Sequence, residues 1–299
     1  MESKLYAIFI IILLILVIPS ASAQEVNIAE KAKQKSVEVI ISESGEIHVK
    51  HVVSSANSPK QVKLLDGTIE NLAITDEKGE EQIVTVIGNN DSVMIFPSDS
   101  DSIIDYDLKD VLLLKDNLWT LDFLYLESTI FVLPEKLDLV FVNDRAVNLG
   151  DKRGFVCHGC QMVLEYSFNI PSNIKQVNWE DKEFLVEVKT FADIENFDFN
   201  QPTKEISLEV NDNNQFITII IPLKLLWEPY MVYLDEEKVF FNQYINNGTH
   251  VWLNMKPQTT GEITIVGTTV VPEFPIIAPL AVGFLMILIL PLVRKFNLR

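Results

Sequence analysis

The sequence predicts an all-β protein: two Ig-like β-sandwich modules, with a signal peptide before them and a C-terminal transmembrane helix after them. Three observations predict it. Short runs of alternating apolar and polar residues recur at about 8–12-residue spacing, with turn residues between them. No stretch between the two ends keeps a helical period of apolar residues. Each end of the chain, by contrast, holds a long apolar run without an internal charge.

Residues 1–23 are predicted to be a secretory signal peptide. The run Leu5–Val17 is almost wholly apolar, and Ala21-Ser22-Ala23 follows it as a small-x-small cleavage site. Signal peptides normally begin with a net positive charge, whereas here Glu2 cancels Lys4. An uncleaved N-terminal anchor is therefore the alternative.

Residues 24–172 are predicted to form the first sandwich. A charged, helix-capable stretch at 28–34 precedes its strands. Turn residues at 76–79 and 88–91 separate strand-like runs. The strands expected from the alternating pattern are 37–41, 47–51, 62–65, 71–75, 82–87, 92–96, 102–108, 118–124, 129–133 and 137–142.

Residues 173–270 are predicted to form the second sandwich. Pro171-Ser172-Asn173 is the most loop-like break in the central part of the chain and places the domain boundary there. A single compact sandwich of about 250 residues is the alternative on domain-size grounds. The strands expected around and after the break are 161–169, 183–190, 204–210, 215–221, 231–235, 238–245, 249–255 and 262–268.

Two segments of the predicted modules echo each other. Thr129–Val147 and Thr218–Val239 each contain an apolar strand stopped by proline, a bridge with lysine and leucine, and a strand that turns through acidic residues into the next. The echo predicts two related modules, because an internal repeat sets the fold. Chance similarity between two hairpins is the other interpretation.

Residues 271–299 are predicted to anchor the chain in a membrane. Phe274–Val293 contains no charged residue, and its twenty residues give about 30 Å of helix, enough to cross a bilayer core. Arg294, Lys295 and Arg299 follow, and such cations stay on the cytoplasmic side. We therefore expect a single-pass protein of the cell membrane, with an extracellular ectodomain and the lipid bilayer as a partner.

The start of this tail resembles a known sorting signal. Pro272, Glu273 and Phe274, followed by an apolar span and a basic end, resemble the PEFG-CTERM signal of surface proteins from ammonia-oxidising archaea. The resemblance implies an archaeal cell-surface protein whose tail an archaeosortase-like transpeptidase reads, with surface-layer or other envelope proteins as partners. Pro275 stands where the motif has glycine, so two outcomes stay open. The tail is either cut and replaced, or it remains as a transmembrane helix.

The second predicted module carries its own series of strand and turn motifs. In chain order they are Ile194–Phe199, Ile206–Val210, Ile219–Pro222, Val232–Asp235, Asn247–His250 and Ile263–Thr269. The series resembles the β-sandwich found just outside the membrane anchor in archaeal surface proteins. That resemblance implies a β-sandwich and brings no enzymatic role with it.

The charge balance excludes one class of partner. The chain has 42 acidic and 24 basic residues, and its net charge of −18 repels nucleic acid and anionic lipid head groups. Such a surface suits cations, cationic partners or simple solubility outside the cell. We expect no nucleic-acid partner.

Both cysteines of the chain lie in a Cys-His-Gly-Cys motif at 157–160. Outside the cell two thiols three positions apart usually oxidise, so a local disulfide at a strand edge is expected. The alternative is a metal site, in which Cys157, His158 and Cys160 with a distant histidine bind copper or zinc. A redox pair would need a following helix to lower the thiol pKa, whereas the next residues indicate a strand. Haem attachment would need histidine where Gln161 stands.

The remaining candidate ligands favour solvated or core positions. His48 and His51 are three apart on an expected strand and so point to opposite faces. In the acidic run at 99–110, Asp105 and Asp107 alternate with apolar residues, as on the solvated face of a strand. Calcium is the alternative, but the run lacks the glycine and the final glutamate of a calcium loop.

Two further groups of residues are singled out by type. Asn90 and Asn247 begin Asn-x-Ser/Thr sequons in predicted turns and are the glycosylation candidates. Trp119 and Phe123 are expected in the core of the first sandwich.

No catalytic motif of the common hydrolase, metalloprotease, P-loop or dinucleotide-binding types occurs in the sequence. The sequence therefore predicts a structural or binding ectodomain of the archaeal cell envelope, without catalysis or cofactor. The alternative is a surface-tethered metal-binding or redox protein that uses the motif at 157–160. A hydrolase ranks third and would require a buried carboxylate pair in a pocket.

Overall fold

The structure, a computed structural model, describes residues 29–179 and 181–268. These residues form strands, turns and loops and no helix, which confirms the predicted all-β class. The predicted signal peptide at 1–23 and the tail at 271–299, with Pro272, Glu273 and Phe274, lie outside the described residues. Within the described part, no helix has the length and apolar character to span a bilayer.

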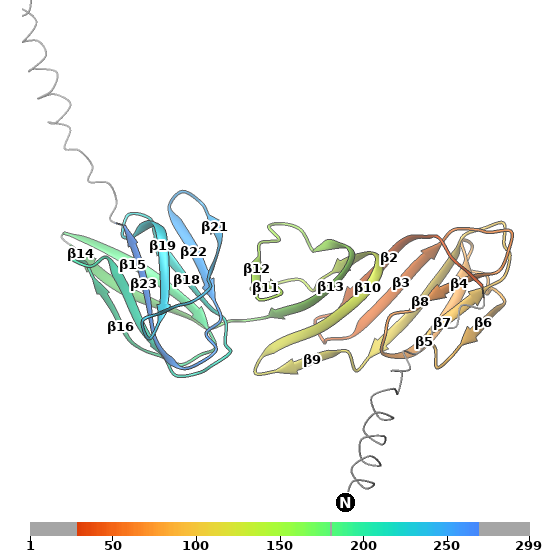
Figure 1. Cartoon of the computed structure of the whole chain (residues 1–299). Coiled ribbons are helices and arrows are strands. Elements are labelled where there is room, and N and C mark those ends of the chain that lie inside the picture. Colours follow the sequence, from red (N-terminus) through yellow and green to blue (C-terminus); the bar gives the residue numbers. More distant parts are fainter. Residues whose placement is uncertain (1–28, 180, 269–299) are drawn as a thin grey trace, which may run out of the picture. The chain divides into compact units, whose positions relative to one another are not determined.

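The chain divides into two compact units. The described residues of the first unit are 29–35, 51–66 and 73–105, and those of the second are 36–50, 67–72 and 106–268. The first unit contains a four-stranded sheet (Figure 1). Its strands, in sheet order, are β1 (Glu30–Lys31), β4 (Lys60–Lys63), β7 (Ser92–Ile95) and β6 (Val84–Ile87).

Strand β1 corrects one expectation. The stretch at 28–34 was expected to be helix-capable, but Glu30 and Lys31 pair in parallel with Lys60 and Gln61 of β4. An ion pair between Lys60 and Glu30 joins the same two strands. Pairing with a distant strand therefore overrides the local propensity of these charged residues.

A nine-stranded sheet draws on residues of both units. Alternate residues are buried along its strands, as in β8, where every second side chain is buried. The strands, in sheet order, are β12 (Arg145–Val147), β11 (Leu139–Val142), β13 (Gly154–Ser167), β10 (Leu118–Val132), β2 (Gln34–Ile41), β3 (Ile47–Val53), β8 (Ser102–Lys109) and β5 (Thr68–Asp76), with β9 (Leu112–Lys115) paired to β10.

Two five-stranded sheets make up the rest of the second unit and face each other across one apolar core (Figure 1). Ile219 and Leu253 enter this core from one sheet, and Leu208 and Ile265 enter it from the other. The first sheet has the order β14 (Ser172–Trp179), β15 (Lys182–Thr190), β18 (Ile217–Pro222), β22 (His250–Met255) and β21 (Asn242–Asn246). The second has the order β16 (Ile194–Asn200), β17 (Glu205–Val210), β23 (Gly261–Thr268), β19 (Trp227–Leu234) and β20 (Glu237–Lys238).

The expected break at residues 171–173 is shorter than the sequence indicated. Strand β14 begins at Ser172 and pairs with β15 along its whole length, so only residues 168–171 lie between strands β13 and β14. Strand β14 is mostly polar and its few apolar residues follow no two-residue period, which is why the sequence pattern did not reveal it. The domain boundary at residue 172 stays a prediction.

The two echoing segments share a local hairpin and then diverge. Asn143 and Asp144, at the first turn, have φ of 51° and 61°, and Asp235 and Glu236, at the second, have φ of 47° and 69°. Both are two-residue turns with two left-handed residues, which suit the twist of a hairpin. However, β10 and β11 both pair with β13, whereas β18 and β19 belong to different sheets. The likeness therefore extends to a hairpin and not to a whole module.

Candidate functional site

The Cys-His-Gly-Cys motif lies within β13, opposite an irregularity in β10. Cys157 pairs with Thr129 and Cys160 with Tyr125, and the register shifts between them. Gly159 at this shift has a φ of +60°, and a Cβ on it would lie 2.5 Å from the carbonyl oxygen of Leu126. Only glycine therefore fits the bulge without displacing the backbone of β10.

Cys157 and Cys160 form a disulfide across this bulge, with their Cα atoms 5.9 Å apart. On its other side β13 pairs with β11 only at Leu164–Ser167. Among the described strands none pairs with this side of the motif, which therefore lies at an open sheet edge. The exposed His158 places its Nδ1 3.1 Å from the Ser128 hydroxyl. No group of three His, Cys, Asp or Glu side chains in the described residues is arranged to hold a metal ion.

The two histidines of β3 lie on opposite faces, as the strand period predicted. His51 is fully buried, and its Nδ1 lies 2.6 Å from the Gln34 side-chain oxygen. Burial lowers the pKa of His51 to about 4. His48 is half-buried and contacts Asp107 at 3.0 Å. The Asn71 amide, and after it His48, hold the pKa of Asp107 below its ordinary value.

The acidic run at 99–110 matches the predicted solvated face only in part. Asp105 and Asp107 lie on the half-exposed face of β8, as expected. Asp101 is only 8% exposed, contrary to that prediction. Its carboxylate pairs with Lys35 and accepts the backbone N–H of Ser55 at 3.1 Å, so it ties three segments of the first unit together. The hydrogen bond from Lys35 lowers the pKa of Asp101.

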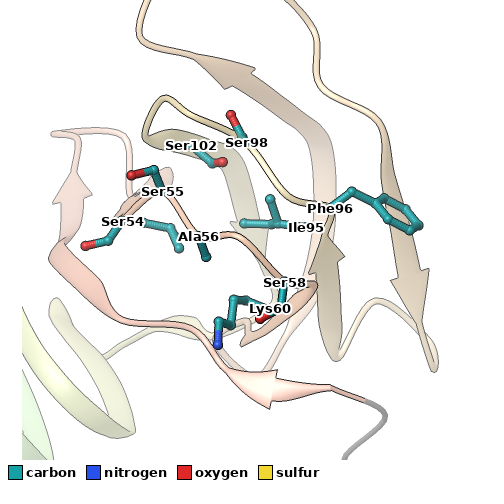
Figure 2. Close-up of a pocket in the computed structure, with 10 residues that line it drawn as sticks. Ser54, Ser55, Ala56, Ser58, Lys60, Ile95, Phe96, Ser98 and Ser102 are labelled. Carbon is teal, nitrogen blue, oxygen red and sulfur yellow. The ribbon is translucent and has the colours of Figure 1, made fainter.

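Figure 2 shows a polar hollow of the first unit, with Ser98 and Ser102 at one side and Ser58 and Lys60 at the other. Its free volume of about 10 Å³ is close to the minimum for one water molecule. The Ser102 hydroxyl donates to the Gln82 side-chain oxygen at 2.6 Å, and the Gln82 amide donates to Ser98 at 3.4 Å. These serines hold the loops around β4 and β8, and the hollow is too small for an organic substrate.

Both glycosylation candidates lie where the sequence placed them. Asn90 is exposed in the turn between β6 and β7, and Asn247 is exposed in the turn between β21 and β22. The Asn247 side-chain oxygen accepts hydrogen bonds from the Thr249 hydroxyl at 2.8 Å and from the backbone N–H of His250 at 2.8 Å. These bonds hold the Asn247 side chain in a turn that is open to solvent.

Another polar site was not predicted from the sequence, because its members are far apart in the chain. Lys256, just after β22, places its Nζ 3.1 Å from the Glu165 carboxylate and 3.0 Å from the Asp144 carboxylate. Glu165 is 6% exposed and belongs to β13, whereas Asp144 is the exposed turn residue of the β11–β12 hairpin. One lysine thus joins a five-stranded sheet to the nine-stranded sheet.

Aromatic contacts complete this site, which we call the junction. Lys256 Nζ lies 4.5 Å from the centre of the Phe216 ring, and Phe216 stacks on Phe141 with 3.5 Å between ring centres. Phe141 is the register partner of Glu165, so the two side chains leave the same face of the sheet. Asn242 adds a hydrogen bond of 3.1 Å from its amide to the backbone oxygen of Ala146. Cation–π contact, stacking and ion pairing therefore act at one place.

The pKa values at the junction show how its charges are balanced. Burial raises the pKa of Glu165, and the nearby Lys256 opposes this effect. Burial by itself lowers the pKa of Lys256, but Asp144 and Glu165 outweigh it and raise the pKa above the ordinary value. Both carboxylates are engaged by the same ammonium group. The junction is therefore arranged to connect the sheets.

Comparison with known proteins adds little about activity. No protein-family model matches the chain, and no curated protein matches it either. Among solved structures, the chain is similar to the aminopeptidase N family protein of Idiomarina loihiensis, with 10% sequence identity and a TM-score of 0.34. The similarity covers 49% of this chain and 31% of that chain, so the chain spans less than a third of that protein's length.

Proposed function

We propose that the protein is a membrane-anchored extracellular protein of the archaeal cell envelope, built of two Ig-like β-sandwich modules, with a structural or binding role and no catalysis. One observation carries the proposal: the two cysteines of the chain are joined to each other in an all-β body. Disulfides persist mainly in oxidising surroundings outside the cytosol. The high acidity and the two apolar ends of the sequence support the same location.

The polar residues of the described part support a non-catalytic role. Asp101, Glu165 and Lys256 each hold two or more segments together, and the hydroxyls of the serine-lined hollow bond to neighbouring side chains. A surface-layer protein or another envelope protein is the partner that this role implies.

Cell fractionation combined with intact-mass measurement tests the proposal. We expect the mature chain to start at Gln24, to remain with the membrane after alkaline washing, and to be digested by protease added outside intact cells. A variant that lacks 271–299 should be released into the medium. Recovery of the full-length chain from the cytosol, with residues 1–23 still present and resistant to external protease, would overturn the proposal.

A second candidate function uses the motif at 157–160 as a metal or redox site. The observation that favours it is the exposed position of His158 beside a disulfide at an open sheet edge. Reduction would free two thiolates next to an imidazole, a ligand set suited to copper or zinc. Metal analysis after reduction should then find stoichiometric metal that is lost in Cys157→Ser. Absence of metal from the reduced protein would reject this candidate.

A further inference from the structure

The second unit contains a cleft beside the junction. It has a volume of about 240 Å³. It lies between the β11–β12 hairpin with its flanking residues and the sheet that contains β15, β21 and β22. Pockets for drug-sized molecules measure about 300–1,000 Å³, so this cleft suits a smaller molecule with a single ring. Clefts where two packed layers meet are common places for ligands.

Two aromatic side chains line this cleft. Trp252 is half-exposed on β22, and Tyr244 is the additional residue where the β21–β22 register shifts between Gln243 and Ile245. Burial raises the pKa of Tyr244 to about 12, and a hydrogen bond with Thr218 of β18 opposes this effect. The Tyr244 ring is therefore held across the sheet face and packs partly against the buried cluster that contains Phe141 and Phe216. It forms a fixed wall of the cleft, and the half-exposed Trp252 offers its ring to an apolar ligand surface.

The polar residues of the cleft carry opposite charges. Lys189 Nζ lies 3.8 Å from the Asp138 carboxylate, and it also lies 4.0 Å from Glu187. Asp138 also accepts the backbone N–H of Ile170 at 2.9 Å, which fixes its position. The exposed Asn148 lies at the rim. Among the residues that line the cleft, the charges of Lys189 and Asp138 compensate each other, so the cleft offers hydrogen-bonding groups without a net charge of its own.

We propose that this cleft binds a neutral sugar ring. A pyranose presents an apolar C–H face, which suits Trp252 and Tyr244, and a rim of hydroxyl groups, which suits Lys189 and Asp138. The inference specifies the binding role proposed above and does not depend on the membrane anchor. Glycan-bearing neighbours on a cell surface would be partners of this chemistry.

Ligand-observed NMR on the full chain tests this inference. The chain is purified in a detergent without a sugar head group, and glucose, mannose and N-acetylglucosamine are each added at millimolar concentration. We expect saturation transfer to at least one of these sugars. The affinity for that sugar should fall about tenfold in Trp252→Ala, because losing one stacked ring costs about 1.4 kcal/mol. Val147→Phe, which fills the cleft from the β12 side, should abolish the signal altogether.

Trp227→Ala is the matched control, because Trp227 is 41% exposed on β19 and does not line the cleft. Its sugar affinity should equal that of the unmodified chain. No transfer to any of the three sugars, an equal loss in both tryptophan variants, or preferred binding of the charged glucuronate would overturn the inference. Trp252→Ala, Val147→Phe and Trp227→Ala should all fractionate with the membrane as the unmodified chain does. A failure of sugar binding would therefore leave the proposal of a membrane anchor untouched, and fractionation tests that proposal separately.

Discussion

The two ends of strand β13 carry polar groups in opposite surroundings. At Cys157–Cys160 the strand lies at an open edge, and its polar atoms meet solvent, a disulfide partner and one serine hydroxyl. At Glu165 the same strand is covered, and the residue is only 6% exposed. In the sequence, the first end shows a recognisable Cys-His-Gly-Cys motif, whereas the second end shows only a glutamate that belongs to no motif.

The contrast shows that burial, more than the presence of a recognisable motif, decides how far stability depends on a polar group. A short disulfide constrains few residues of the unfolded chain. A buried carboxylate needs its partner at all times, because an unpaired charge in a low-dielectric surrounding is strongly destabilising. The junction should therefore govern stability, whereas the motif at 157–160 should govern redox behaviour.

The largest effect is expected from Lys256→Met. The substitution leaves Glu165 buried without its cation, and breaking a buried pair in this way costs about 3–5 kcal/mol. Denaturant unfolding at neutral pH measures the loss. Arg153→Met, which breaks the exposed pair with Glu135, is the control and should change stability by less than about 0.5 kcal/mol.

A double variant sharpens the same prediction. Lys256→Met combined with Glu165→Leu removes both buried charges, and such replacements are often neutral. Stability should therefore recover most of the loss. If the single lysine variant is as stable as the unmodified chain, the junction contributes no more than a surface ion pair, and the contrast between the two ends of β13 disappears.

The second effect is the pH dependence of stability that comes from the buried His51. In the folded chain the pKa of His51 is about 4, against 6.5 ordinarily. Between these pH values the unfolded chain binds a proton that the folded chain does not, so the free energy of unfolding falls as pH drops from 6.5 to 4. At about 1.4 kcal/mol for each pKa unit, the fall amounts to about 3 kcal/mol.

Unfolding curves measured from pH 7 to pH 4 check this prediction. His51→Gln should flatten the fall in stability over this range, because the titrating group is gone. Equal slopes for His51→Gln and the unmodified chain would show that carboxylates alone cause the acid sensitivity.

A smaller effect is expected from the disulfide. Replacing Cys157 and Cys160 together by serine opens a loop of four residues, which costs about 2 kcal/mol in the chain-entropy account. Thermal unfolding with and without reductant measures it. The double variant should be insensitive to reductant, and a loss as large as that of Lys256→Met would contradict the order proposed for the two ends of β13.

The smallest effect is expected at the sequons. Asn90→Gln and Asn247→Gln should each remove one glycan mass from the native protein and lower stability by no more than about 1 kcal/mol, because both side chains are exposed and Asn247 loses only the hydrogen bonds of its own turn. Intact-mass spectrometry of protein from its own cells measures the glycans. Unchanged masses in both variants would remove glycosylation from the account.

Local patterns predicted the strands well where alternation was strong. Strands β3, β8 and β15 lie within two residues of their expected bounds because one face of each is buried and the other is half-exposed. The short β9 and the polar β14 were missed, since neither has a clear apolar face. Two expected runs at 118–124 and 129–133 proved to be one strand, β10, because a bulge interrupts the period without ending the pairing.

The candidate sites divide in the same way. The motif at 157–160, the two sequons and the opposed histidines of β3 could be predicted, because each depends on residues close together in the chain. The junction could not, since Lys256 is 91 residues from Glu165 and 112 from Asp144. The burial of Asp101 was also missed, because its partner Lys35 lies on a distant strand.

The sequence by itself determined the all-β class, most strand positions and the turn chemistry, since these follow from periodicity and from local backbone preferences. The sequence also showed the likeness of the segments at 129–147 and 218–239, and the structure limits it to two hairpins with left-handed residues at 143–144 and 235–236. Only the tertiary structure decided which sheet each hairpin joins, which charges are buried, and where a cleft remains. These features depend on packing between distant segments, and no local pattern in a single chain encodes such packing.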